Sequence, residues 1–166
     1  MLLDKSSFYI ELCSFTVLPG VIDQVTTEAF AQVFGSPEAR KWRNIVYLLL
    51  TEEPIPRVLG ESNIVYIGQT KQSFRNRYFR YSGLFANGTA NKHKYGNIIE
   101  HYGPMRIAVG TFERYGNSLR EAECQLLWWY FQNHCEYPPV NYSKATIYND
   151  VRETTKGPSG QSIATN

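Results

Sequence analysis

The sequence predicts an α+β fold, because runs typical of buried strands alternate with segments typical of helices. Residues 44–50 (NIVYLLL) and 63–67 (NIVYI) are rich in aliphatic and β-branched residues, as buried strands are. Residues 105–113 (MRIAVGTFE) fit a third strand. Two prolines and a glycine lie between the first two runs, so we expect a loop over 51–62 that closes an antiparallel hairpin.

The N-terminal segment, 1–42, is predicted to be a strand and helix extension of the main domain. Residues 8–17 have the composition of a strand, and 26–34 (TTEAFAQVF) fit a short helix that begins at a capping threonine and ends before Gly35. The pair Ser36-Pro37 predicts one more helical turn, since proline is tolerated at the first helical position. Nothing in this segment indicates a particular chemistry.

The rest of the chain fits one domain over 43–148 and a flexible tail over 149–166. The tail contains GPSGQSIATN, which is too polar to bury enough surface to order itself. A chain of 166 residues can form a single domain with a modest core. Helices are predicted over 73–81, 95–102 and 118–134, with a loop around Asn87-Gly88 over 84–92.

The net charge of +2 hides a local excess of basic residues. No acidic residue occurs between Glu61 and Glu100, and aromatic residues are interspersed among the basic ones there. Such a segment suits a phosphate backbone, although a solvated helix face would have the same composition. The candidate nucleic-acid contacts are Lys71, Arg75, Arg80, Lys92, His93 and Lys94.

Composition excludes several other classes of protein. No window approaches the roughly 18 consecutive apolar residues of a membrane span, so we expect no membrane segment. The N-terminus lacks the apolar stretch of a signal peptide. Three cysteines, Cys13, Cys124 and Cys135, show no metal-binding spacing, which favours reduced thiols and a cytoplasmic protein.

Two tyrosines on the predicted strands are the first candidate catalytic residues. Because side chains alternate along a strand, Tyr47 shares a face with Ile45 and Leu49, and Tyr66 shares a face with Ile64. If the strands pair, both hydroxyls can point into one site. The alternative is an aromatic cross-strand pair that only stabilises the hairpin.

An arginine and a carboxylate complete the candidate site. On helix 73–81, Arg77 lies at the edge of the apolar stripe, four residues before Tyr81, and can present its donors to a phosphate. Glu123 falls among apolar residues of helix 118–134, whereas Glu121 lies beside Trp128 on another side. A buried carboxylate requires a partner, which is either a metal ion or an arginine such as Arg77 in a structural ion pair.

These residues, in this order, resemble the GIY-YIG nuclease superfamily. Ile45-Val46-Tyr47 resembles the first signature, Tyr66-Ile67-Gly68 matches the second, and Pro138-Pro139-Val140-Asn141 is similar to the closing PxxN element. Arg77 with Tyr81, and then Glu123, resemble the catalytic residues of that superfamily. Ile45 replaces the signature glycine, and an added helical turn before Pro138 leaves open whether Glu121 or Glu123 is the carboxylate.

The resemblance implies a small three-stranded antiparallel sheet flanked by helices and a metal-dependent endonuclease that hydrolyses phosphodiester bonds in duplex DNA. Glu123 would bind Mg²⁺ or Mn²⁺, Arg77 the scissile phosphate, and Tyr47 or Tyr66 would be the general base. Tyr81 would orient the phosphate or water, and Asn141 would support the site.

We expect no second DNA-binding domain beside these motifs. That organisation resembles a compact, site-specific restriction enzyme, which acts as a homodimer. The alternatives are a structure-selective repair nuclease, a phage or homing-type nuclease, and a non-catalytic nucleic-acid-binding domain on the same scaffold.

Overall fold

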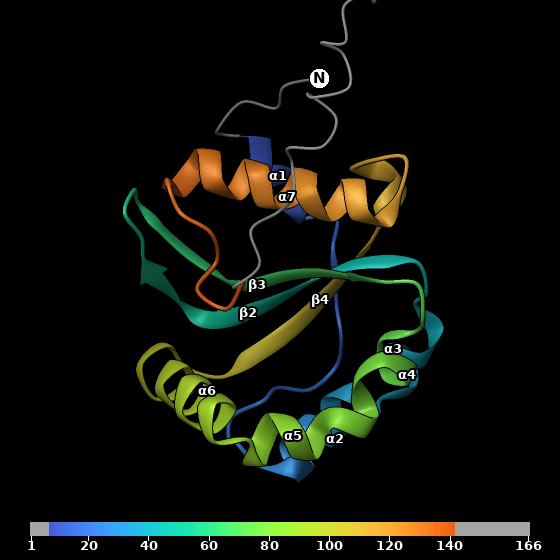
Figure 1. The fold of residues 1–166 in the computed structure, drawn as a ribbon, viewed down its shortest axis with the longest axis vertical. Helices are drawn as coiled ribbons and strands as arrows, with labels where there is room; N and C mark the ends of the chain where they lie inside the picture. Colours follow the sequence, from blue (N-terminus) through green and yellow to red (C-terminus); the bar gives the residue numbers. More distant parts are fainter. Residues whose placement is uncertain (1–6, 142–166) are drawn as a thin grey trace, which may run out of the picture.

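The fold is α+β, with one antiparallel sheet between two layers of helices (Figure 1). The computed structural model describes residues 7–141. The sheet has four strands in the order β1-β4-β2-β3, one more than the expected three. The additional strand has only two residues and pairs with β4, a long-range contact that sequence patterning does not reveal. The strands are β1 (Thr16–Val17), β2 (Ile45–Pro56), β3 (Glu61–Thr70) and β4 (Met105–Thr111).

Helices cover both faces of the sheet (Figure 1). One face packs against α1 (Ser7–Leu12) and α7 (Leu119–His134). The other face packs against a layer that contains α2 (Thr27–Phe34), α4 (Phe74–Tyr78), α5 (Ser82–Asn87) and α6 (Thr89–Tyr102), with α3 (Pro37–Lys41) at its end. Two short 3₁₀ helices, η1 (Phe79–Tyr81) and η2 (Phe112–Arg114), follow α4 and β4. Within residues 7–141, no helix is long and apolar enough to span a bilayer.

The N-terminal segment shares the core of the main sheet. Phe30, Val33 and Phe34 of α2 are almost completely buried in the same cluster as β2 and β4. The helix over 26–34 and the turn at Ser36-Pro37 are confirmed. The strand predicted over 8–17 is confirmed only at its end, where 16–17 form β1, and is wrong over its first part, because 7–12 form α1. Its aromatic and β-branched residues favoured a strand, but helical winding allows Phe8 to pack against α7.

The predicted strand–hairpin–strand unit is confirmed, with longer strands than expected. β2 continues to Pro56, so only 57–60 form the tip, where Gly60 has a φ of 69° and accepts a hydrogen bond from Arg57 N at 2.9 Å. The loop predicted over 51–62 is therefore largely strand. Residues 149–166, the predicted tail, lie outside the described residues.

A register shift in β3 determines which face Tyr66 occupies. Leu49 pairs with Tyr66, but the next residue, Leu50, pairs with Ile64, so β3 holds one extra residue at that point. Tyr66 consequently packs with Tyr47 on the side of α4, whereas Ile64 packs on the side of α7. The expectation that Tyr66 and Ile64 share a face is wrong, because strict alternation fails at the irregularity.

The layer around α4 to α6 is more helical than predicted. The helix expected over 73–81 changes to 3₁₀ geometry at Phe79. The loop expected over 84–92 consists of α5 and the first turn of α6, with Gly88 at their junction. The Asn-Gly pair separates two helices there instead of forming a longer loop.

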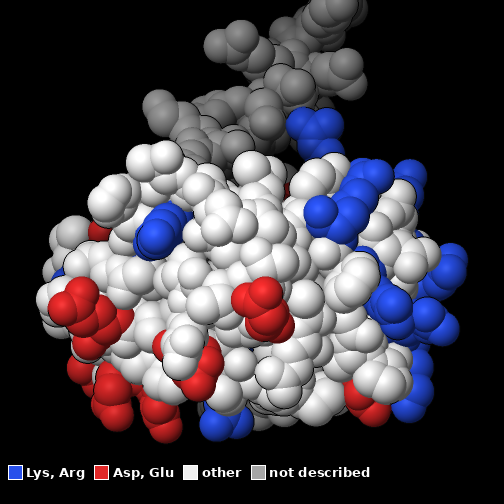
Figure 2. Space-filling view, turned by 90° about the horizontal axis from the view of Figure 1, so that it is seen from below, with Lys and Arg blue, Asp and Glu red and all other residues white. Residues whose placement is uncertain are grey.

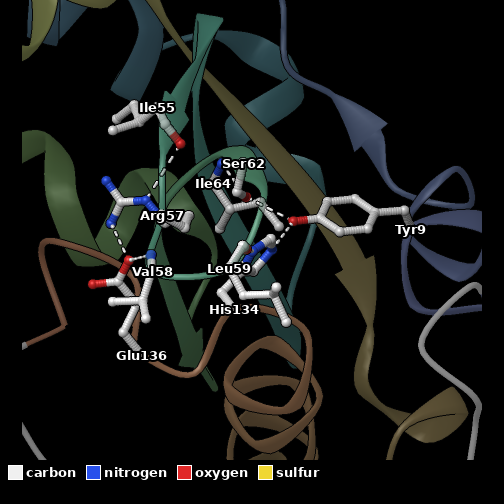
Figure 3. A network of polar contacts seen from close by, with 9 residues as sticks. All are labelled: Tyr9, Ile55, Arg57, Val58, Leu59, Ser62, Ile64, His134 and Glu136. Atoms are coloured by element: carbon white, nitrogen blue, oxygen red, sulfur yellow. Dashed lines mark hydrogen bonds and ion pairs between the residues drawn. The ribbon is translucent and has the colours of Figure 1, made fainter.

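A network of polar contacts joins the hairpin tip to α1 and to the end of α7 (Figure 3). The Tyr9 hydroxyl is hydrogen-bonded to the Ser62 hydroxyl at 2.8 Å and to His134 Nε2. His134 Nδ1 donates to the Leu59 carbonyl oxygen at 2.8 Å, which orients the ring.

Beside these groups, Glu136 accepts a hydrogen bond from Val58 N at 2.9 Å and lies 3.6 Å from the Arg57 guanidinium. We call this set the hairpin cluster. Its members are Tyr9, Arg57, Ser62, His134 and Glu136.

Candidate active site

Three tyrosine side chains meet on the sheet face that is covered by α4. The rings of Tyr47 on β2 and Tyr66 on β3 are stacked, with centroids 5.9 Å apart. Tyr78 on α4 meets Tyr47 edge-on at 5.5 Å, and their hydroxyls are hydrogen-bonded. We call Tyr47, Tyr66 and Tyr78 the phenol cluster. The sequence placed Tyr78 on the buried stripe of its helix but did not indicate this hydroxyl contact.

Gly68 makes the close approach of these rings possible. It pairs directly with Tyr47 in the β2–β3 register. A Cβ atom at this position would lie 2.5 Å from the Tyr47 hydroxyl oxygen and 2.6 Å from Cε1 of Tyr66. The last residue of the Tyr66-Ile67-Gly68 signature therefore has a steric function, because any side chain there would displace the phenol cluster.

Burial raises the pKa of two of these phenols. The pKa of Tyr47 lies well above its ordinary value because its side chain is desolvated, and the neighbouring Tyr78 and Tyr66 add to the increase. The pKa of Tyr66 is also raised, mainly by burial and by Tyr78, but the Arg77 guanidinium opposes the increase. The charge of Glu123 acts on Tyr66 in the opposite sense to Arg77. Tyr66 is thus within the electrostatic reach of both groups.

Glu123 is the half-buried carboxylate of α7. Burial raises its pKa, because the charged form is desolvated. No hydrogen bond or ion pair to its carboxylate is found within residues 7–141, and it does not form the structural ion pair with Arg77 considered above. A carboxylate in such surroundings is stabilised in its ionised form by a cation.

Glu121, the alternative carboxylate, has a structural explanation. It is exposed, and its Oε2 accepts a hydrogen bond from Asn117 N at 2.9 Å, while its own backbone N–H donates to the Ser118 hydroxyl at 3.2 Å. These contacts cap the N-terminus of α7. Of the two acids, only Glu123 is among the groups that shift the pKa of Tyr66.

A metal site built on Glu123 would have one carboxylate, so it would suit only an ion that keeps most of its water ligands. No group of three or more His, Cys, Asp and Glu side chains that could hold a metal occurs in the described part of the chain. Magnesium suits a site with one carboxylate, because it dehydrates reluctantly and is held through few protein ligands. Glu123 is the side chain that would hold such an ion.

Arg77 and Tyr81 do not have the stacked arrangement expected of residues four apart on an α-helix. Arg77 is exposed, with its guanidinium 5.8 Å from the centre of the Tyr78 ring. Tyr81 lies in η1, where its ring meets the Arg80 guanidinium at 4.7 Å. It makes none of the ring contacts that join the phenol cluster, because the tighter 3₁₀ winding changes the direction of its side chain.

Asn141 fastens the strand that carries Tyr66. Its side-chain Nδ2 donates to the Ile67 carbonyl oxygen at 2.7 Å, and its Oδ1 accepts from Ile67 N at 2.9 Å. Val140 N also donates to the Val65 carbonyl oxygen at 2.9 Å. These bonds give the backbone groups on the outer edge of β3 hydrogen-bond partners next to the site. Asn141 therefore supports the strand itself.

Basic side chains gather on the surface beside the site. Figure 2 shows Lys and Arg gathered along one side of the molecule, the side of α3 and α4 in Figure 1, and Asp and Glu along the other. The chain before β2 contributes, since α3 packs against α4 and Asn44 N donates to the Lys71 carbonyl oxygen at 3.4 Å. We call this surface the basic ridge. It comprises Arg40, Lys41, Arg43, Lys71, Arg75, Arg77 and Arg80.

Only four of these seven residues belong to the basic segment identified in the sequence. The run EARKWR at 38–43 was a signal that could have indicated the remainder. The other predicted nucleic-acid contacts lie on α6, where Lys92 and His93 are exposed and Lys94 lines a pocket with Tyr47 and Tyr66. Lys71 is exposed and is not among the groups that shift the pKa of Tyr66.

The geometry thus brings together Tyr47, Tyr66 and Tyr78, with Arg77 beside the Tyr78 ring, and separates Tyr81, while the charge of Glu123 acts on Tyr66. One phenol is within reach of both a guanidinium and a half-buried carboxylate, and a basic surface lies alongside. No protein-family model, curated protein or solved structure matches this chain.

Proposed function

We propose that this protein is a GIY-YIG-type endonuclease that hydrolyses phosphodiester bonds in duplex DNA with Mg²⁺ or Mn²⁺ as cofactor. The observation that carries the proposal is the packing of Tyr66 against Tyr47 and Tyr78 with Arg77 beside the Tyr78 ring, and the charges of Arg77 and Glu123 both act on Tyr66. A phosphodiesterase requires a base for water, a donor for the phosphate and a site for a divalent ion. In this proposal Tyr66 of β3, Arg77 of α4 and Glu123 of α7 would supply them.

Binding of the DNA backbone is the role of the basic ridge. Its side chains are exposed apart from the half-buried Arg75, and the one ion pair it forms within residues 7–141 is Lys41 with Glu38 at 4.0 Å. These cations are therefore available to neutralise phosphates. Arg77 is the member of the ridge next to the phenol cluster, so it would bind the phosphate that is cut.

Tyr66 is a better candidate than Tyr47 for the general base. Tyr47 is 2% exposed, and its hydroxyl is occupied by Tyr78. Tyr66 is half-buried and is the phenol whose pKa Arg77 lowers. A phenol can accept a proton from water only if nearby positive charge stabilises its phenoxide. Tyr47 and Tyr78 would hold the Tyr66 ring in place.

Glu123 would hold the divalent ion. A divalent cation bound there supplies positive charge that stabilises the phosphate and the leaving oxygen during hydrolysis. The same carboxylate has a raised pKa without a cation, so binding of the ion and ionisation of Glu123 are coupled.

The isoleucine that replaces the signature glycine does not disturb this arrangement. Ile45 is completely buried in the main core and pairs with Thr70 and Thr111. Tyr47, two residues later on the same face, still reaches the phenol cluster. The main reason for considering a non-catalytic binding domain is therefore weakened.

A restriction-type enzyme that cuts a specific site as a homodimer remains the preferred form of the proposal. The described part of the chain offers one phenol cluster, and Glu123 is the carboxylate whose charge acts on it, so each copy would cut one strand. A structure-selective nuclease would cut only at forks or flaps, and a homing-type nuclease would cut only at single long sites. The products of digestion therefore distinguish both from a restriction-type enzyme.

Digestion of plasmid and phage DNA tests the proposal. The wild-type protein should cut with Mg²⁺ or Mn²⁺ and be inert with a chelator. Glu123→Gln should abolish cutting while Glu121→Gln, which changes the exposed capping carboxylate of the same helix, should still cut. Discrete fragments would indicate a restriction-type enzyme. Equal activity of the two variants, or a wild-type protein inert on every DNA form, would refute the proposal.

A further inference from the structure

A pocket of about 330 Å³ adjoins the phenol cluster on the side of α5 and α6. Its floor is made of buried side chains, among them Phe34, Phe74 and Tyr95. Its rim is made of half-buried ones, namely Tyr66, Tyr78, Phe85, Asn91 and Lys94. The volume is at the lower end of the range for small-molecule pockets, which suits one heterocycle.

Aromatic side chains dominate the lining of this pocket. Phe85 and Tyr95 are stacked at 5.6 Å with an angle of 19° between their planes, and Tyr47 and Tyr66, stacked at 5.9 Å, belong to the same lining. Flat walls of this kind favour a flat, aromatic occupant, because stacking on such rings stabilises it.

The polar groups at the rim suit an occupant with hydrogen-bonding edges. Asn91 carries both a donor and an acceptor; its Nδ2 donates to the Leu84 carbonyl oxygen at 3.3 Å and its Oδ1 accepts from Lys94 Nζ at 3.1 Å, so an occupant would have to replace these contacts. The Lys94 ammonium also lies 4.6 Å from the centre of the Tyr95 ring. Asparagine side chains can form paired hydrogen bonds with a base edge, and an ammonium group can donate to a carbonyl or phosphate oxygen.

We propose that this pocket binds one nucleobase that has left the DNA stack, next to the phosphate that is cut. The proposal rests on the nuclease function above and adds a feature of its substrate. Tyr66 belongs both to the rim of the pocket and to the group affected by Arg77 and Glu123, so base and phosphate would belong to one stretch of strand. Removing a base from a duplex disrupts its stacking and pairing, so DNA that already contains an unpaired base should bind more tightly.

Equilibrium binding without metal tests the proposal, because no cleavage then occurs. Three fluorescent duplexes of one sequence are compared by anisotropy: fully paired, with one unpaired adenine, and with an unpaired abasic residue at the same place. The adenine bulge should bind at least tenfold more tightly than either of the others. Equal affinity for the adenine and abasic bulges would overturn the proposal, because flexibility of the backbone alone would then explain the preference.

Variants distinguish the pocket from the DNA-binding surface. Asn91→Trp, which fills the rim, and Lys94→Met should each remove the preference for the adenine bulge. Asn97→Ala, an exposed position on the same helix, should retain it. Uniform weakening of all three complexes by Lys94→Met, or unchanged preference in Asn91→Trp, would also overturn the proposal.

The result of the binding experiment can be distinguished from the result of the nuclease test. A protein that cuts paired DNA with Mg²⁺ yet shows no base-dependent preference would retain its function and lack the base pocket. Tight binding of the adenine bulge without any metal-dependent cutting would refute the nuclease and keep the pocket. Absence of DNA binding would refute both.

Discussion

The hairpin cluster and the phenol cluster use the same kind of residue in opposite ways. In the hairpin cluster, the Tyr9 hydroxyl and both ring nitrogens of His134 have partners, and Glu136 is paired with Arg57. Around the phenol cluster, Glu123 has no bonding partner within residues 7–141, Arg77 is exposed, and a pocket adjoins the rings.

Satisfied polar groups stabilise a fold, whereas groups that remain available can bind something else. The hairpin cluster joins α1, the hairpin tip and α7, so its contacts are used within the protein. The groups around Tyr66 are held in place by packing and by Asn141, but their charges are not neutralised by one another. This contrast supports a functional site at the phenol cluster and a structural role for the hairpin cluster.

The largest expected effect comes from the same substitution made in each cluster. Tyr66→Phe should lower the rate of DNA cleavage by about 100-fold or more, as loss of a general base does, with little change in stability. Tyr9→Phe should cut DNA normally but lose about 1–2 kcal/mol of folding stability, because His134 and Ser62 lose a partner. Cleavage assays and thermal melts of both variants check the pair. If both variants changed the cleavage rate and the stability equally, the distinction between a functional and a structural cluster would be wrong.

A second test removes the space on which the phenol cluster depends. Gly68→Ala should cost about 3 kcal/mol, because its Cβ would lie 2.5 Å from the Tyr47 hydroxyl oxygen. Gly83→Ala is the control. It lies in α5, with no side-chain atom nearer than 3.9 Å to the added carbon, so alanine there should stabilise by up to about 1 kcal/mol. Urea unfolding measures both, and a tolerated Gly68→Ala would contradict the structure.

The pH dependence of cleavage sharpens the assignment of the base. The raised pKa of Tyr66 means that its phenoxide is scarce at neutral pH and becomes more abundant as the pH rises. Cleavage should therefore increase about tenfold per pH unit between about pH 7 and 9. Arg77→Gln should move this rise to higher pH, since Arg77 lowers the pKa of Tyr66. A flat profile would show that no phenol loses a proton in the reaction.

The smallest expected effect concerns stability at Glu123. Because the folded-state pKa of this carboxyl is raised, its ionisation opposes folding, and stability is lost as the pH rises through that pKa. At pH 7 without metal, Glu123→Gln should thus be more stable by about 1 kcal/mol, or roughly 3 °C in melting temperature. Mg²⁺ should stabilise the wild-type protein and not the variant. A destabilised Glu123→Gln would mean that the carboxylate has a structural partner.

The sequence was sufficient for the elements whose pattern is local and strong. β2, β3, β4 and the helix that begins after Ser118 follow from aliphatic runs and from a capping serine. The expectation that the two strand tyrosines meet is also confirmed, because the rings of Tyr47 and Tyr66 are stacked.

What the sequence did not predict depends on contacts between distant residues or on small changes of geometry. The pairing of β1 with β4 adds a fourth strand through two residues only. The extra residue in β3 reverses the side of Ile64, the change to 3₁₀ winding at Phe79 separates Tyr81 from the site, and Tyr78 is the third phenol. The basic ridge contains residues of two segments, α3 and the start of α4, and hydrophobic periodicity does not predict that these segments lie side by side.

The attachment of Asn141 to Ile67 has a consequence for protein synthesis. β3 is an edge strand, and its outer side beside Tyr66 is completed only by residues 140 and 141, more than seventy positions later in the chain. Glu123 likewise follows the tyrosines by a long interval. A polypeptide still emerging from the ribosome therefore lacks the assembled arrangement until nearly all of the described chain has been translated. On the proposed function, truncated products would not cut DNA.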